Sequence, residues 1–161
     1  MKTAIVLATD HGSQKLGNRR NGELERRLEY LYRNFGVQLF MEEWASNQGE
    51  SVAKEVALRL DIKWVNIGTP EEPQYRTYTG PIDYPGHDGP FQDSEAPTMY
   101  AYGPFDNQEA RENRMTENII AAMKHYGTGL LVIGLAHLHS LTAKLNSAGF
   151  SVNSFQWLGG Q

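Results

Sequence analysis

Short apolar runs alternate with amphipathic stretches along most of this chain, and this alternation limits the possible folds more than any other feature. The expected strands lie at 4–7, 37–41, 62–67, 129–133 and 150–155. The runs 4–7 and 129–133 are continuously apolar, as is typical of strands covered on both faces. Elsewhere apolar residues recur every three or four positions among charges, which predicts helices; these stretches are 22–35, 51–60, 106–125 and 140–148. Strands and helices in this order favour a mainly parallel sheet with right-handed crossovers. We therefore expect a three-layer, doubly wound α/β domain with about five strands and helices on both faces.

Two strands can be placed within the sheet by their composition. The run 129–133 is the most apolar stretch and is expected at the centre, whereas 150–155 alternates between apolar and polar residues as an edge strand does. The longest helix is expected to begin at Asp106, a residue that suits an N-cap. Its inner stripe is expected to consist of Met115, Ile119, Ile120 and Met123.

Residues 68–105 depart from the alternation. All seven prolines of the chain lie in this segment, together with glycines and tyrosines, and no apolar periodicity persists. A long segment without regular structure inside a compact domain is usually a functional loop or lid. The tyrosines argue against disorder, because aromatic side chains supply the burial that disordered segments lack. We expect a loop or lid within one domain that spans residues 1–161.

Composition narrows the classes of partner. The formal net charge is −4, and the basic residues are scattered, so no electrostatic footprint for nucleic acid exists. No stretch approaches the roughly 20 apolar residues that span a bilayer. The apolar run at 4–7 ends at Thr9-Asp10-His11 without a small-residue cleavage site, which favours a strand over a signal peptide. The absence of cysteine agrees with a reducing compartment. We expect a soluble cytoplasmic protein that acts on a small molecule or peptide and binds neither nucleic acid nor membrane. The sequence does not determine the oligomeric state, and a homo-oligomer is one alternative.

Three polar clusters follow three of the expected strands. They are Thr9-Asp10-His11 after the first, Glu42-Glu43 after the second, and His137 with His139 after the fourth. The carboxyl ends of parallel strands meet at one edge of a sheet, and ligands bind there where the strand order reverses. These clusters are therefore expected to converge on one site.

Imidazoles and carboxylates support two kinds of chemistry. His11, Glu42 and His137 would be enough to hold a divalent ion such as Mn, Zn or Co, with positions left open for water and substrate. The same residues could act as general acid and base without a metal, and the sequence does not separate these alternatives. Glu42 and Glu43 should diverge on an extended backbone, so only one would face the site. Glu42 is favoured as the ligand, and Glu43 is the candidate general base.

Further candidates flank these clusters. Arg111 and Arg114 lie three apart near the start of the long helix and share one face. Arg111 is the candidate for stabilising negative charge on a substrate, and Glu112 is expected to point to solvent. The remaining candidate binding residues are Asp10, Ser13, Gln14, Arg114 and His139.

The motifs Leu7-Ala8-Thr9-Asp10-His11 and Gly134-Leu135-Ala136-His137 resemble the paired Gly-x-x-His motifs of the TraB/Tiki superfamily, which includes GumN-like, ChaN-like and erythromycin-esterase-like proteins. Ala8 stands where the first motif has glycine. The resemblance extends to Glu42-Glu43, to the segment 111–115 and to 145–152, "LNSAGFSV". It implies a site in which the two histidines and a glutamate serve metal-dependent hydrolysis, as in the Tiki proteases. Other members bind haem or hydrolyse a macrolide ester. The resemblance therefore indicates where the site lies more clearly than which substrate it accepts.

The expected function is metal-assisted attack of water on an ester or amide of a small molecule or peptide. One alternative is a non-catalytic module that binds an anionic metabolite in the same pocket. Another is an interaction domain in which the segment 68–105 presents its tyrosines to a partner, since aromatic residues are enriched at interface cores.

Overall fold

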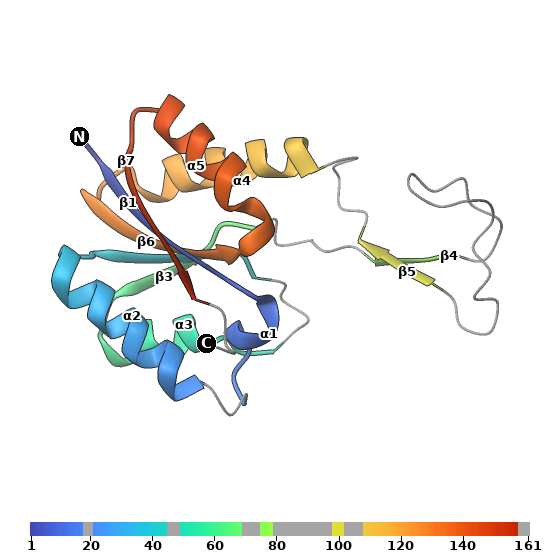
Figure 1. The fold of residues 1–161 in the computed structure, drawn as a ribbon, viewed down its shortest axis with the longest axis horizontal. Helices are drawn as coiled ribbons and strands as arrows, with labels where there is room; N and C mark the ends of the chain where they lie inside the picture. The colour runs from blue at the N-terminus through green and yellow to red at the C-terminus, as the bar shows by residue number, and fades with distance from the viewer. Residues whose placement is uncertain (18–20, 45–48, 69–74, 79–97, 102–107, 158–161) are drawn as a thin grey trace.

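The computed structural model describes residues 1–17, 21–44, 49–68, 75–78, 98–101 and 108–157, with only the backbone for His11, 75–78 and 98–101. Its main body is one five-stranded parallel sheet in the order β3-β2-β6-β1-β7 (Figure 1). The strands are β1 (Thr3–Thr9), β2 (Leu39–Glu42), β3 (Lys63–Asn66), β6 (Thr128–Gly134) and β7 (Ser151–Trp157). The expected α/β class is confirmed, as are the central place of β6 and the edge place of β7.

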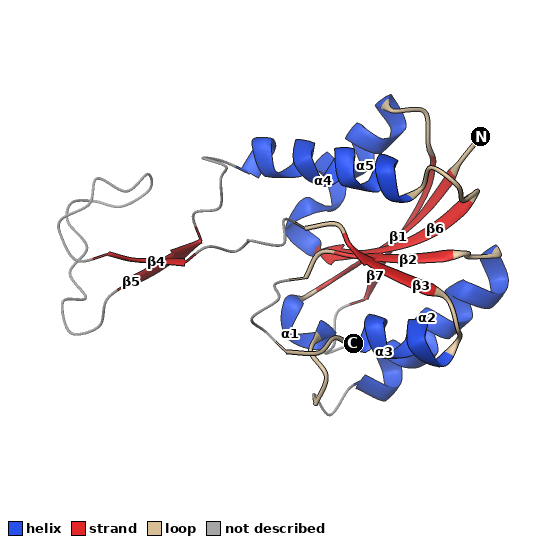
Figure 2. Ribbon diagram, turned by 180° about the vertical axis from the view of Figure 1, so that it is seen from behind, coloured by secondary structure: helices blue, strands red, loops and turns tan. Residues whose placement is uncertain are grey.

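Helices cover both faces of the sheet, as Figure 2 shows from behind. One face carries α1 (His11–Gln14), α2 (Asn21–Phe35) and α3 (Val52–Arg59), and the other carries α4 (Gln108–Ala122) and α5 (Leu138–Ser147). A 3-10 turn (Leu135–His137) joins β6 to α5. None of the helices in the described ranges is long and apolar enough to cross a membrane.

Two cores, one on each face, explain why the inner strands β1 and β6 are almost continuously apolar. Along β6, Leu131 and Ile133 pack under α4 and α5, whereas Leu130 and Val132 pack under α2 and α3. Successive side chains of a strand point to opposite faces, so a strand covered on both sides must be apolar at every position. Full burial of one such aliphatic side chain contributes about 1.5–3 kcal/mol.

The connections diverge at the carboxyl end of β6. The chain leaves β1 and β2 toward the face covered by α2 and α3, and it leaves β6 toward the face covered by α5. Because β6 lies between β2 and β1, its connection runs to the face opposite to the connections of both neighbouring strands. A crevice at such a reversal is where open α/β sheets bind their ligands.

Three expectations need correction or fall outside the described residues. Residues 75–78 and 98–101 form a two-stranded antiparallel ladder, β4 (Tyr75–Tyr78) with β5 (Thr98–Ala101), so the segment 68–105 is not wholly a loop. Ile120 is 46% exposed, because one residue beyond Ile119 lies about 100° around the helix from the buried stripe. The expected N-cap Asp106 and most of the segment 68–105 lie outside the described residues.

Candidate active site at the carboxyl ends of the strands

Glu42 and Glu43 diverge to opposite faces of the sheet, as expected. Leu39 and Met41 belong to the core under α4 and α5, and Phe40 belongs to the core under α2 and α3. Strand alternation therefore places Glu43 with the first core and Glu42 with the second. It is Glu43, not the favoured Glu42, that meets His137.

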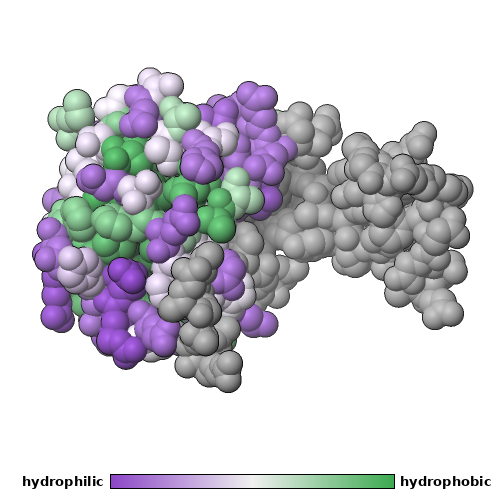
Figure 3. Space-filling model, in the orientation of Figure 1, coloured by the Kyte–Doolittle hydropathy of each residue, from purple (hydrophilic) through white to green (hydrophobic). Residues whose placement is uncertain are grey.

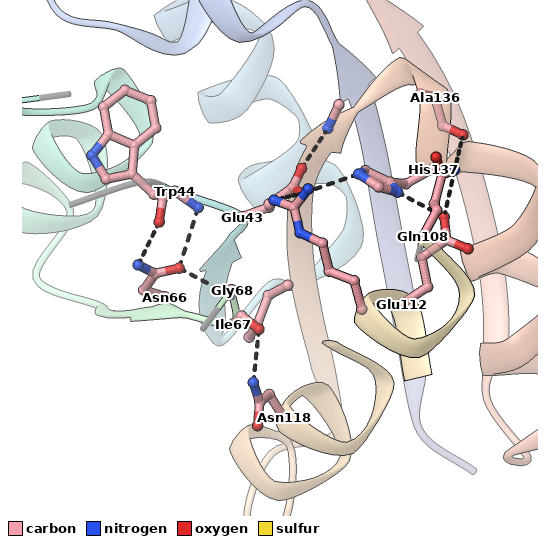
Figure 4. A network of polar contacts seen from close by, with 12 residues as sticks. Glu43, Trp44, Asn66, Ile67, Gly68, Gln108, Glu112, Asn118, Ala136 and His137 are labelled. Atoms are coloured by element: carbon pink, nitrogen blue, oxygen red, sulfur yellow. Dashed lines mark hydrogen bonds and ion pairs between the residues drawn. The ribbon is translucent and has the colours of Figure 1, made fainter. Parts of the chain in front are cut away.

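The imidazole of His137 lies between two carboxylates. Its Nε2 is 3.1 Å from Oε2 of Glu43, and its Nδ1 is 2.6 Å from Oε2 of Glu112 (Figure 4). All three side chains are buried. The 3-10 turn after β6 carries His137 to this place, and the backbone N–H of Gly134 donates to the other oxygen of Glu43 at 3.3 Å.

The first turns of α4 supply the rest of the cluster. Arg111 donates from Nη2 to Oε2 of Glu43 at 3.1 Å, and its side chain is 34% exposed. Glu112 accepts hydrogen bonds from Ser140 at 2.7 Å and from Gln108 at 3.2 Å, besides the bond from His137. The cluster thus combines an accessible guanidinium with a buried imidazole and two buried carboxylates. We call Glu43, Arg111, Glu112 and His137 the histidine cluster.

Charge determines the protonation state of the histidine cluster. Burial by itself would lower the pKa of His137, but the adjacent carboxylates of Glu43 and Glu112 outweigh it and raise the pKa. Burial likewise opposes ionisation of Glu112, but hydrogen bonds from Ser140 and His137 prevail and lower its pKa. Both carboxylates therefore favour the protonated ring, which can donate from its two nitrogens.

A second network fixes the backbone beside Glu43. The side chain of Asn66 accepts from the backbone N–H of Trp44 at 3.2 Å and of Gly68 at 2.9 Å, and it donates to the carbonyl of Trp44 at 2.7 Å (Figure 4). Asn118 of α4 donates to the carbonyl of Ile67 at 2.9 Å. These bonds tie the ends of β2 and β3 to α4, the helix that carries Arg111 and Glu112.

Glu42 lies in a separate buried environment. Its carboxylate accepts from Gln14 of α1 at 2.9 Å, from Ser51 at 2.6 Å and from the indole of Trp64 at 2.9 Å. Ser51 also caps α3 by accepting from the N–H of Lys54. Burial raises the pKa of Glu42 to about 7, although the three donors lower it, and the nearby charge of Glu43 adds to the rise. These contacts hold α1, α3 and β3 to β2, on the face away from His137.

The remaining candidates occupy different places. His11 begins α1 after β1, and its side chain lies outside the described part of the chain. Asp10 accepts from Ser13 at 2.7 Å, which closes the first turn of α1 and leaves Asp10 itself exposed. His139 is exposed on α5, and Arg114 is exposed and pairs with Glu117 at 3.5 Å. Arg114 is therefore not part of the histidine cluster, although it lies three residues from Arg111.

The donor set of the histidine cluster fits part of a metal shell. His137 and Glu43 present Nε2 and Oε2 to one another, and Nδ1 bonds to a carboxylate, which is how metal-ligating histidines are usually oriented. Within the described ranges, no group of three or more His, Cys, Asp or Glu residues could hold a metal ion. The described cluster thus offers two ligands, and His11 stays the candidate for a third.

Glu112 is the residue that sequence reasoning misplaced. It was expected in solvent, but it is buried, because it lies three residues before Met115 and seven before Ile119 on the inner stripe of α4. A carboxylate on an apolar stripe must find donors, and His137 and Ser140 supply them. A charged residue at a position of the apolar stripe was therefore the sequence signal that could have predicted a buried, hydrogen-bonded Glu112.

Comparison with known protein families, with curated proteins and with solved structures finds no match to this chain. The resemblance to the TraB/Tiki superfamily consequently rests on the motifs quoted above alone.

Proposed function

We propose that this chain is a hydrolase that directs water at an ester or amide of a small molecule or peptide, with its reaction centre at the histidine cluster. The observation that carries the proposal is the pairing of His137 with Glu43 at 3.1 Å, at the edge where the connections diverge. A buried histidine between two carboxylates can move protons at neutral pH, which is the requirement for general acid–base catalysis.

Each residue of the cluster has a distinct proposed role. His137 transfers the proton at Nε2, and Glu43 receives or returns it. Glu112 holds Nδ1, so that the ring keeps one orientation. Arg111, which is partly exposed, binds the negative charge that develops on the substrate oxygen.

We further propose a metal-assisted version of the site, in which a divalent ion, Mn, Zn or Co, would take the place of the proton that His137 and Glu43 exchange. His137 and Glu43 would hold this ion, with His11 as the third ligand in place of Glu42. Such an ion lowers the pKa of bound water into the neutral range. The resemblance to the TraB/Tiki superfamily supports this version.

The test is hydrolysis of chromogenic esters and peptide amides after chelation and after reloading with Mn, Zn or Co. We expect metal-dependent turnover and a metal-dependent rise in melting temperature, both lost in Glu43→Gln and His137→Ala. His125→Ala and Glu55→Gln serve as controls, because both side chains are exposed away from the cluster. Circular dichroism establishes that each variant is folded. Turnover that survives in folded His137→Ala contradicts the proposal, and turnover that survives chelation removes the metal from it.

A second candidate, retention of an anionic metabolite without turnover, is favoured by the guanidinium of Arg111. This group is 34% exposed, and a guanidinium presents a fork of donors that matches an anionic group. A bound small anion in native mass spectra, displaced in Arg111→Gln and accompanied by no turnover of any substrate, would select this function.

A further inference from the structure

A hollow lies away from the histidine cluster, between α2 and the edge strand β7. It has a volume of about 540 Å³, within the roughly 300–1,000 Å³ of small-molecule sites. We call it the α2–β7 pocket; its lining residues are Glu23, Arg26, Arg27, Tyr30, Phe155 and Trp157. Figure 1 shows α2 beside β7, on the opposite face of the sheet from α4, the helix that carries Arg111 and Glu112.

The sequence spacing explains why these side chains share one hollow. The four residues from α2 fall at positions 23, 26, 27 and 30, which is one stripe of a helix. That stripe flanks the buried stripe of Leu24, Leu28 and Leu31 and so overhangs the border of the sheet. Phe155 and Trp157 are two residues apart and point to the same face of β7. Within the described part of the chain, β7 is the edge strand and pairs with β1 on one side, so the hollow lies at this edge of the sheet, beneath α2.

The charged residues that line the α2–β7 pocket are Arg26, Arg27 and Glu23, so positive charges outnumber negative ones. Among the described residues, Arg26 and Arg27 form no ion pair, whereas Arg59 on the neighbouring α3 pairs with Glu25 at 3.7 Å and Glu29 at 2.6 Å. The acidic residues on the α3 side of α2 are thus paired with Arg59, whereas the two arginines on the β7 side have no ion-pair partner among the described residues. A guanidinium presents a planar fork of donors that matches a carboxylate or phosphate.

The floor of the α2–β7 pocket is aromatic and held in place. Phe155 packs edge-to-face against Phe35 of α2, with ring centroids 5.7 Å apart and planes at 61°. Trp157 is 6% exposed, whereas Tyr30 on the rim is 56% exposed. In Figure 3, hydrophilic side chains along α2 border a more apolar area over β7. A fixed aromatic surface favours stacking by a planar ring.

We propose that the α2–β7 pocket binds a planar aromatic anion, with the ring against Phe155 and Trp157 and the carboxylate or phosphate on Arg26 and Arg27. The class includes aromatic acids and nucleotides, which share a flat ring and an anionic group. This site does not depend on the function of the histidine cluster.

The test follows the indole N–H signals of the three tryptophans by NMR in the full chain, with Trp157→Phe used to assign one signal. Benzoate and adenosine monophosphate are titrated, with neutral benzamide and inorganic phosphate as matched probes that lack the charge or the ring. We expect at least one aromatic anion to shift the Trp157 signal saturably and to bind about tenfold or more tightly than either matched probe, as a charge-assisted hydrogen bond would give. A response to benzoate alone identifies an aromatic acid, and a response to adenosine monophosphate alone identifies a nucleotide.

Single-residue variants complete the test. Arg26→Gln and Arg27→Gln should each weaken binding about tenfold. Arg33→Gln should bind like the unmodified chain, because Arg33 is an exposed arginine of α2 that does not line the pocket. Absence of a saturable shift, equal affinity for benzamide and benzoate, or equal affinity in the Arg26 and Arg27 variants would overturn the proposal.

Discussion

Replacing Glu42 with glutamine is expected to stabilise the fold at alkaline pH and to leave its stability almost unchanged at pH 5. Glu42 is fully buried, and its carboxylate meets donors from Gln14, Ser51 and Trp64. A glutamine has the same shape, can accept from Ser51 and Trp64, and can donate to Gln14 once that amide turns over. It does not carry the charge whose burial is costly.

The magnitude follows from the pKa of Glu42, which rises from 4.5 to about 7. One pKa unit corresponds to about 1.36 kcal/mol, so ionising Glu42 costs about 3 kcal/mol more in the folded chain than in the unfolded one. Between these two values the folded chain binds the proton and the unfolded chain releases it. The free energy of unfolding therefore falls as pH rises through this window, and the contribution of Glu42 is constant above it.

Urea denaturation of the unmodified chain and Glu42→Gln at pH 5 and at pH 8 measures the difference. We expect similar stability at pH 5 and a gain of about 2–3 kcal/mol for the variant at pH 8. Glu55→Gln, an exposed change on α3, is the control for altered net charge. An equal loss of stability at both pH values would refute the reasoning, because it would show that the three donors outweigh the cost of burial.

Three other changes test the contacts around the site and in the core. Glu112→Gln should lower the pKa of His137, measured by NMR titration of the imidazole, because one of the two charges that raise it is removed. A raised histidine pKa adds stability below about 6.5 that is lost as pH rises through the folded value, so this variant should lose most stability on the acid side, as urea denaturation would show. Ser51→Ala should cost about 2–3 kcal/mol in urea denaturation, since it removes both the cap of α3 and a donor to a buried carboxylate; a loss below 0.5 kcal/mol would argue against that pairing. Gly129→Ala should lower the free energy of unfolding by about 1–3 kcal/mol, because the added methyl would meet the sulfur of Met123, and unchanged stability would show that this sulfur moves aside at little cost.

Much of the fold could be predicted because each strand of the five-stranded sheet carries an apolar or an alternating run. The run 129–133 within β6 is apolar at every position, which matches burial under helices on both sides. The same property concealed which glutamate faces His137. Leu39, Phe40 and Met41 are all apolar, so the sequence of β2 shows no alternation that would assign its two faces, and only the packing separates Glu42 from Glu43.

Other parts depended on contacts far apart in the chain. β4 and β5 are four residues each, and their pairing joins positions such as Tyr78 and Thr98 across a long separation. A run that short carries too few residues to show a period. The bond from His137 to Glu112 spans 25 positions, and only the meeting of the turn after β6 with the start of α4 creates it.

The most direct test of the reaction centre is the ¹⁵N NMR signal of each imidazole nitrogen of His137, recorded before and after addition of zinc. The account predicts that Nε2 acquires a metal-bound chemical shift while Nδ1 keeps its proton toward Glu112, and that Glu43→Gln weakens zinc binding. Zinc that leaves both nitrogens of His137 unchanged would contradict it.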